Sequence, residues 1–330
     1  MKGLILCAGK GTRLYPITLK LPKTLIPVAN ISILQSCIEK LKEQAIVEIG
    51  VVIHPSQEDM IRAQVGSGEI WGVALTYIYQ YEAKGISHAV KQAQTFIGEE
   101  AFLLLLGDNL ISHSLTELRL DVEARGSSGS LLLAEVANPR DYGIAEVQDG
   151  RILQLEEKPA APKSKLAVLG AYALDSSIFQ AVHQIKPSQR GEYEITDAIQ
   201  WLINHGKQVT YHVTEQLNMD VGTVERWLQA NKQMLDAQPA KDAIHHSVIM
   251  DNCSIVSPVS IKQGSVLKNC VIGPYVSISS DSHIEDCRIE NCILLSGVHL
   301  KHIPYLLKDT IIGFQSVMTG LQAKKEGGSE

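Results

Sequence analysis

The stretch Gly3-Leu-Ile-Leu-Cys-Ala-Gly-Lys-Gly-Thr-Arg-Leu-Tyr-Pro16 joins a short apolar run to a turn that contains two glycines. The run has the pattern of a buried β-strand, and the glycines at 9 and 11 let backbone N–H groups approach phosphate oxygens closely. The spacing is neither that of a P-loop nor that of a dinucleotide fingerprint, since Leu14 stands where the third glycine of the latter would be. We interpret the turn as a phosphate-binding loop to which Arg13 and Lys23 add two cations. The alternative is a glycine turn with solvated surface cations.

Strand and helix patterns alternate from this loop to about residue 235. Alternation of this kind predicts an α/β domain over residues 1–236, with a Rossmann-like, mostly parallel sheet. Apolar spacing predicts helices over Ser32–Gln44, His88–Ile97, Glu194–His205 and Thr223–Asp236. A further helix is predicted by an apparent capping box of Ser56 with Asp59. Apolar runs predict strands over Ile46–Ile53, Leu75–Tyr79, Phe102–Leu106, Ser130–Val136, Gly143–Val147 and Leu166–Leu174.

The character of the sequence changes after Asp236. We interpret Ala237–Lys241 as a linker, and from Ile244 the helical period disappears. Aliphatic residues then recur about every six positions, at Ile255, Ile261, Leu267, Ile272, Ile278 and Ile284. This hexapeptide period predicts a parallel β-helix over 244–315, in which three hexapeptides complete one coil. The pattern fades after about His302, and we expect 316–330 to be a disordered polar tail.

The composition excludes several classes of protein. The chain has 330 residues and a net charge of −6, with a pI near 6.0, so there is no global electrostatic basis for binding nucleic acid. None of the six cysteines forms a C-x-x-C pair or a zinc-type spacing. No apolar run approaches the length of a membrane span, and the first one is too short for a signal peptide. We therefore expect a cytoplasmic protein with reduced thiols and no membrane partner.

Two acidic motifs carry candidate metal ligands. In Leu105-Leu-Gly-Asp-Asn109, Asp108 directly follows a predicted buried strand, at the edge of the sheet where α/β ligand sites form. One carboxylate there suits Mg²⁺, although a turn aspartate that caps the next helix is the alternative. The second motif, Asn218-Met-Asp-Val-Gly-Thr223, opens a predicted helix, and N-terminal capping by Thr223 is its alternative interpretation.

The motif Gly9-x-Gly11-Thr12-Arg13, followed by Pro22-Lys23, resembles the signature of the sugar-1-phosphate nucleotidyltransferases. The closest branch is the glucose-1-phosphate thymidylyltransferases in their long form, which has a C-terminal left-handed β-helix. The resemblance is almost continuous to about residue 235 and extends loosely to about 310. It implies transfer of a nucleotidyl group from dTTP or UTP to glucose-1-phosphate or a related hexose-1-phosphate, with release of pyrophosphate. A β-helix tail often builds oligomer contacts, so we expect a homo-oligomer.

The resemblance also implies roles for individual residues. Mg²⁺ would be held by Asp108 and Asp220, and catalysis would depend on Arg13, Lys23 and Lys158. The nucleotide would be bound, with Gln80 reading the pyrimidine edge, by Leu6, Ala8, Gly9, Gly11, Thr12, Arg13, Lys23, Gln80, Gly85 and Asp108. The sugar phosphate would be bound by Asn109, Gly143, Glu157, Lys158, Val168, Tyr172 and Glu194.

Several alternatives stay open at the level of sequence. Glu156-Glu157-Lys158-Pro159 taken alone is a commonplace solvated turn, and Glu194 could simply start a helix. Thr24 stands where many short-form relatives carry Gln, which bears on the identity of the nucleotide and sugar rather than on the reaction. A catalytically silent subunit that binds nucleotide sugars is a rival of another class. The presence of both loop cations and both acidic residues argues against it.

Overall fold

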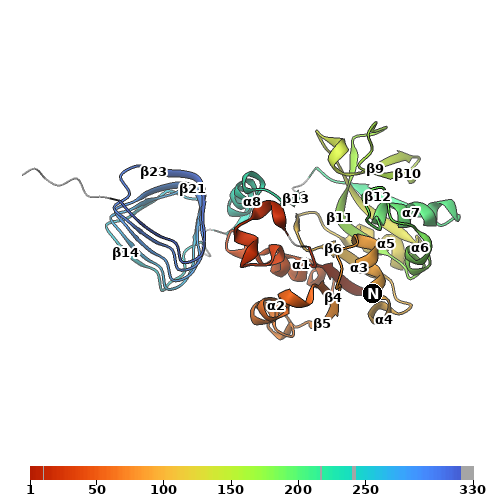
Figure 1. Cartoon of the computed structure of the whole chain (residues 1–330), viewed down its shortest axis with the longest axis horizontal. Coiled ribbons are helices and arrows are strands. Elements are labelled where there is room, and N and C mark those ends of the chain that lie inside the picture. Colours follow the sequence, from red (N-terminus) through yellow and green to blue (C-terminus); the bar gives the residue numbers. More distant parts are fainter. Residues whose placement is uncertain (10, 216–217, 240–242, 321–330) are drawn as a thin grey trace, which may run out of the picture. The chain divides into compact units, whose positions relative to one another are not determined.

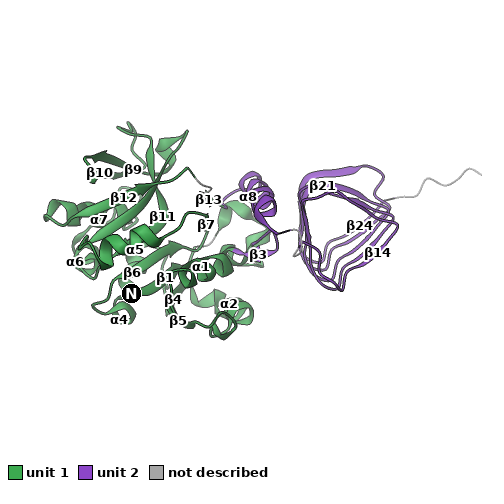
Figure 2. Cartoon of the chain, turned by 180° about the vertical axis from the view of Figure 1, so that it is seen from behind, with its two compact units in different colours: residues 1–26, 33–220 green, residues 27–32, 221–330 purple. Residues whose placement is uncertain are grey.

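The computed structural model describes residues 1–9, 11–215, 218–239 and 243–320 (Figure 1). The chain divides into two compact units (Figure 2): unit 1 is Met1–Ile26 with Ile33–Asp220, and unit 2 is Pro27–Ser32 with Val221–Glu330. The division differs from the expected boundary at residue 236. Helix α8 (Val224–Ala237) groups with the β-helix rather than with the α/β sheet.

Unit 1 is built on a nine-stranded sheet whose main path runs β10-β9-β11-β6-β1-β4-β5. Its centre is parallel and comprises β1 (Lys2–Leu6), β4 (Glu48–Ile53), β5 (Ala74–Tyr79) and β6 (Phe102–Leu106). The other half is mainly antiparallel and comprises β8 (Gly129–Glu135), β9 (Gly143–Gln148), β10 (Arg151–Glu157), β11 (Leu166–Leu174) and β12 (Val209–Val213). The α/β class is therefore confirmed. β10 and β12 were missed by the sequence patterns.

The helices of unit 1 present apolar faces to this sheet. In α1 (Ile33–Lys42) the residues at helical spacing, such as Leu34 and Leu41, are fully buried. The remaining helices are α2 (Glu58–Val65), α3 (Ile86–Gln92), α4 (Gln94–Ile97), α5 (Thr116–Glu123), α6 (Ile178–Gln184) and α7 (Ile195–Asn204).

Two local expectations were wrong. The segment predicted as one helix over His88–Ile97 belongs to two, α3 and α4, which are separated at Ala93. The capping box does not involve Ser56 and Asp59. It is formed by the side chains of His54 and Gln57, and it opens the 3-10 turn Pro55–Gln57 that precedes α2. A histidine ring nitrogen takes the place of the usual hydroxyl or carboxylate acceptor, which is why the motif was not recognised.

Unit 2 contains the β-helix. Figure 1 shows its coils stacked as a prism with flat sides. Its strands all pair in parallel, and they are β14 (Ile249–Asp251), β15 (Ser254–Ile255), β16 (Val259–Ile261), β17 (Val266–Lys268), β18 (Val271–Ile272), β19 (Val276–Ile278), β20 (His283–Glu285), β21 (Arg288–Leu294), β22 (His299–Lys301), β23 (Leu306–Ile312) and β24 (Val317–Thr319). Ile255 is partly buried, and the other five predicted anchors are at most 2% exposed.

The β-helix extends further than the sequence indicated. β23 and β24 lie beyond His302, where the pattern was expected to fade, and β24 lies in the segment expected to be tail. The hexapeptide pattern is hard to read there because the charged or polar residues Lys308, Asp309 and Thr310 follow Leu307, and two isoleucines, Ile311 and Ile312, then stand next to each other. Residues 321–330 of the expected tail, and 240–241 of the expected linker, lie outside the described residues.

One face of the β-helix is covered within unit 2. Asn231 of α8 is fully buried, and its Oδ1 accepts hydrogen bonds from the hydroxyl of Ser277 and the backbone N–H of Ala29. Ala29 belongs to the hairpin of β2 (Pro27–Val28) and β3 (Ile31–Ser32), and Trp227 of α8 donates to the carbonyl of Pro27 at 2.7 Å. These bonds explain why Pro27–Ser32 groups with unit 2. Among the described residues, no helix has the length and apolar character needed to cross a bilayer.

Candidate active site

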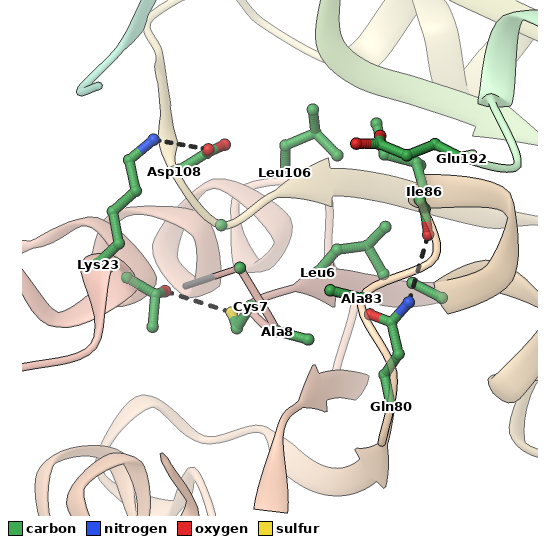
Figure 3. A pocket seen from close by; sticks show the side chains of 15 residues that line it. Leu6, Cys7, Ala8, Lys23, Gln80, Ala83, Ile86, Leu106, Asp108 and Glu192 are labelled. Carbon is green, nitrogen blue, oxygen red and sulfur yellow. Dashed lines mark hydrogen bonds and ion pairs between the residues drawn. The ribbon is translucent and has the colours of Figure 1, made fainter. Parts of the chain in front are cut away.

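A pocket of about 250 Å³ opens where β1 and β6 end in unit 1 (Figure 3). The carboxyl ends of parallel strands meet there, which is the usual ligand edge of an α/β sheet. Seven of the residues expected to bind nucleotide line the pocket: Leu6, Ala8, Gly9, Lys23, Gln80, Gly85 and Asp108. Gly11, Thr12 and Arg13 do not line it. Cys7, Gly107 and Glu192 do, and the sequence patterns had not singled them out. Thr24 lines it too, and the sequence had marked this residue only for its bearing on the identity of the nucleotide and sugar.

Lys23 joins the two predicted metal ligands. Its Nζ lies 2.7 Å from Oδ2 of Asp108 and 2.7 Å from Oδ1 of Asp220, and its side chain is only 8% exposed. Figure 3 shows the ammonium group directed at Asp108. Two carboxylates that are far apart in the sequence therefore face each other across a single cation.

The strand pairing around Asp220 explains this convergence. β7 (Asn109–Ile111) begins directly after Asp108, and it pairs antiparallel with β13 (Asn218–Asp220) in a register that places Asp220 opposite Asn109. The guanidinium of Arg13 lies 3.5 Å from Asp220, but this side chain is 64% exposed. Arg13 is thus free to turn toward a bound anion, whereas Lys23 is held in place.

The glycine loop is shaped by Gly11. Its φ is +63°, and a Cβ at this position would lie 3.0 Å from Cβ of Lys23. The Gly11 carbonyl accepts a hydrogen bond from the hydroxyl of Thr18 at 2.7 Å. Any larger residue would strain the turn and displace Lys23, which connects the loop conformation to the charge cluster.

Gln80 occupies the opposite part of the pocket and is 5% exposed. Its amide nitrogen donates to the carbonyl of Gly85 at 3.3 Å and lies 3.0 Å from Nδ1 of His88. Gly85 precedes α3 with a φ of +97°. Its added Cβ would lie 2.6 Å from the carbonyl oxygen of Tyr193, so glycine is required for this close approach.

A second cluster surrounds Arg190. Its guanidinium lies 3.5 Å from Glu157 and 3.4 Å from Glu194, two of the residues expected to bind sugar phosphate. Burial raises the pKa of Glu157, and the neighbouring Glu194 carboxylate raises it further. Burial also raises the pKa of Glu194. Arg190 was not among the predicted site residues.

Gly143 packs tightly against this second cluster. A Cβ there would lie 2.6 Å from Cγ2 of Thr196 and 2.9 Å from Oε2 of Glu157. The structure therefore brings together Gly143, Glu157 and Glu194. Lys158 follows β10 with a φ of +43°, and its side chain is exposed. Its backbone N–H donates to the carbonyl of Tyr142 at 3.0 Å, which fixes the backbone from which the side chain extends.

The remaining predicted sugar-phosphate residues lie in or beside β11. Val168 and Tyr172 of β11 are buried in the apolar core, and burial raises the pKa of the Tyr172 phenol. Asn109 is oriented so that its amide nitrogen donates to Asp108 at 3.0 Å and its oxygen accepts from the N–H of Gly170 at 3.2 Å. Asn109 therefore holds the Asp108 carboxylate by a hydrogen bond, whereas Val168 and Tyr172 belong to the apolar core that packs on the sheet.

Comparison with known proteins identifies the family of this chain. The profile of the nucleotidyl transferase family matches residues 2–237. A low-salt glycan biosynthesis nucleotidyltransferase of Haloferax volcanii is 41% identical over 73% of this chain and 68% of its own length. A glucose-1-phosphate thymidylyltransferase of Streptomyces griseus is 37% identical over 80% of this chain and 74% of its own. A structure of UDP-glucose pyrophosphorylase complexed with UDP-glucose superposes with a TM-score of 0.63 at 27% identity, covering 72% of this chain and 99% of that one.

Proposed function

Because this chain belongs to the nucleotidyl transferase family, we propose that it joins dTTP or UTP to glucose-1-phosphate or a related hexose-1-phosphate and releases pyrophosphate. The observation that carries the proposal is the convergence of Asp108 and Asp220 on Lys23, at the pocket that Lys23 and Asp108 line. The relatives named above include enzymes of thymidine and of uridine nucleotides, and thymine and uracil offer the same hydrogen-bonding edge. Both triphosphates are therefore candidate substrates.

The chemistry needs charge and alignment more than a nucleophile from the protein. A phosphate oxygen of the sugar phosphate forms a bond to the α-phosphorus of the triphosphate. The bond from this phosphorus to the bridging oxygen breaks, and pyrophosphate leaves with the electron pair. Because the attacking oxygen is already an anion, the work of the protein is to hold two anionic groups in line and neutralise them. Lys23 and Arg13 supply positive charge on the triphosphate side.

Asp108 and Asp220 fit a Mg²⁺ ion by their chemistry. Mg²⁺ prefers one or two carboxylates together with phosphate oxygens, and these two carboxylates already share one cation, the Lys23 ammonium. Bound Mg²⁺ would add positive charge close to the phosphates. Lys23 remains within reach of both carboxylates and so keeps them oriented.

The Arg190 cluster is the proposed site for the acceptor. Glu157 and Glu194 offer carboxylate oxygens to sugar hydroxyls, and Gly143 lets the backbone approach Glu157 closely. Lys158 follows Glu157 directly and supplies a positive charge for the phosphate of the acceptor. A catalytically silent subunit would have no need for the paired carboxylates and their lysine, so we favour the enzyme.

A substrate panel tests this proposal. The protein is incubated with Mg²⁺, one of several nucleoside triphosphates and one of several hexose-1-phosphates, and pyrophosphate release is measured. We expect release with UTP or dTTP and a loss of about 10²–10³-fold in Asp220→Asn, the typical effect of removing one electrostatic element of a site. Asp59→Asn, at an exposed position of α2, is the matched control. Full activity of Asp220→Asn would contradict the assignment.

A further inference from the structure

The amide of Gln80 is held at its nitrogen end. Nε2 carries two hydrogens, and it has two neighbours at bonding distance, the carbonyl of Gly85 at 3.3 Å and Nδ1 of His88 at 3.0 Å. A carbonyl can only accept, so the longer contact to Gly85 favours this orientation of the amide, and the shorter contact to His88 adds to it when Nδ1 accepts. In Figure 3 a dashed line joins the nitrogen of Gln80 to this carbonyl. Both hydrogens are committed within the protein, and the amide oxygen remains for a ligand.

His88 must be neutral for this arrangement to hold. Nδ1 can accept the second hydrogen of Gln80 only if the ring proton is on Nε2. Burial lowers the pKa of His88 from its ordinary value, and the charges of Lys84 and Lys91 lower it further, whereas Glu82 raises it. The ring of Tyr193 lies 6.4 Å away, between centroids. The surroundings therefore favour the neutral ring. The amide nitrogen of Gln92 lies 3.4 Å from Nε2 of His88, and because the Gln92 side chain is exposed, its amide can turn its oxygen to an Nε2 proton, which leaves Nδ1 to accept from Gln80.

We infer that His88 is a positioning residue that keeps the Gln80 amide oxygen, rather than its nitrogen, facing the base. The inference rests on the proposed function and adds the residue that decides which hydrogen-bonding edge the pocket accepts. Uracil and thymine carry an N–H at ring position 3, which donates to an oxygen. Cytosine carries a lone pair at this position, which an oxygen repels. The pocket thus selects uracil and thymine over cytosine through a histidine that need not touch the base.

The test compares equilibrium binding of UTP, dTTP and CTP by calorimetry at pH 8. We expect the wild-type protein to bind UTP and dTTP about tenfold more tightly than CTP. His88→Leu removes the acceptor and lets the amide reverse, so this ratio should fall to about twofold, the loss of one hydrogen bond of about 1 kcal/mol. His88→Asn restores an acceptor oxygen near the position of Nδ1 and should recover the ratio.

A pH series separates positioning from a merely structural role. Below the pKa of His88 the ring gains a proton at Nδ1 and becomes a donor, so the ring then favours an amide that presents its oxygen to the ring and its nitrogen to the pocket, against the preference of the Gly85 carbonyl. The UTP-to-CTP ratio should therefore fall as the pH is lowered through the pKa of His88 in the wild type but not in His88→Asn. Titration of the triphosphate affects both nucleotides equally and cancels in the ratio.

The matched control is His183→Leu, which removes another histidine that contacts a glutamine. Its Nε2 lies 2.9 Å from Oε1 of Gln94, at an exposed position outside this pocket. The control should keep the wild-type ratio. A His88→Leu variant that kept the ratio would overturn the inference, and so would a wild-type ratio near one. Pyrophosphate release is measured separately. A protein that binds UTP selectively but releases none would refute the proposed function and leave the inference standing.

Discussion

In unit 1 the parallel strands β1 and β6 end beside Lys23 and Asp108, whereas in unit 2 the parallel strands β17, β20 and β22 repeat an aliphatic residue at one register position. Leu267, Ile284 and Leu300 occupy this position in successive coils, and each is at most 2% exposed. Parallel pairing of strands thus positions a single cluster of charged residues in unit 1. In unit 2 it stacks the same kind of apolar contact from coil to coil. Substitutions in the site should therefore change the catalytic rate, whereas substitutions in the stacked core of the β-helix should change the free energy of unfolding.

The strongest test of this contrast is Lys23→Met. The substitution leaves Asp108 and Asp220 facing each other without their shared cation, and it removes positive charge from the pocket. We expect kcat to fall by about 10²–10³-fold while the far-UV circular dichroism spectrum is retained. The control is Lys20→Met, at an exposed position just before the site. Turnover within twofold of the wild type would show that the charge cluster has no part in the reaction.

The corresponding test in unit 2 is Leu267→Ala. A cavity in the stacked core should lower the free energy of unfolding by about 2–5 kcal/mol and leave kcat unchanged. Urea denaturation and a steady-state assay measure the two effects. Val317→Ala, at a position 73% exposed on the same sheet, should cost less than about 0.5 kcal/mol. If Leu267→Ala reduced kcat with no loss of stability, the assignment of roles to the two units would be wrong.

Unit 1 also contains a polar cluster centred on Asp121, whose residues do not line the pocket. It tests whether a polar cluster in this unit can act on stability instead of on activity. Asp121 is 5% exposed and accepts hydrogen bonds, each of 2.7 or 2.8 Å, from Ser130, Thr210, Arg125 and His212. Burial raises the pKa of Asp121, but these hydrogen bonds outweigh it and lower the pKa to about 2.

The pKa of Asp121 is lower in the folded chain than in the unfolded chain, so its carboxylate stabilises the fold. This contribution is fully present above about pH 4 and is lost as the pH falls through about 2. This loss should be about 2 kcal/mol in the wild type. In Asp121→Asn the same contribution should be missing at neutral pH, so the wild type and the variant should converge in acid. Urea denaturation at several pH values measures this difference. Parallel pH profiles for the two proteins would exclude the role of Asp121.

The smallest effect is expected from Gly143→Ala. The new methyl group would displace Thr196 or Glu157, and we expect KM for the hexose-1-phosphate to rise about three- to tenfold, the equivalent of about 1 kcal/mol. Gly313→Ala in unit 2 is the control, because its Cβ would meet only the Ser316 hydroxyl, at 3.7 Å. An unchanged KM would place the acceptor elsewhere than beside Glu157.

Much of the fold was predictable because its signals are local. Phe102–Leu106 is apolar at every position, as a strand covered on both faces requires, and β6 has these same bounds. Capping by Thr223 was the alternative interpretation of the second acidic motif, and the Thr223 side chain does accept a hydrogen bond from the N–H of Arg226 at the start of α8. By contrast, β10 was not recognised because its apolar and polar residues do not alternate regularly. Its pairing with β9 also shifts register between Ile152 and Gln154.

The candidate site was predictable in its residue types but not in its grouping. Asp108 was found because it follows a buried strand, and Gln80 because of the resemblance to a known family. Cys7, Thr24 and Gly107 adjoin residues that were singled out, and only the fold of the loop showed that they line the pocket too. His88 carried no sequence signal, since its contact with Gln80 depends on how α3 begins.

The sequence by itself determined the kinds of elements, the hexapeptide stack and the presence of a glycine loop with nearby cations. These follow from the spacing of apolar residues and from backbone preferences, which act between near neighbours. Only the tertiary structure decided that Lys23 lies between Asp108 and Asp220, and that Pro27–Ser32 belongs with the β-helix. Such contacts depend on the order and register of strands that are far apart in the chain, and no local pattern encodes them.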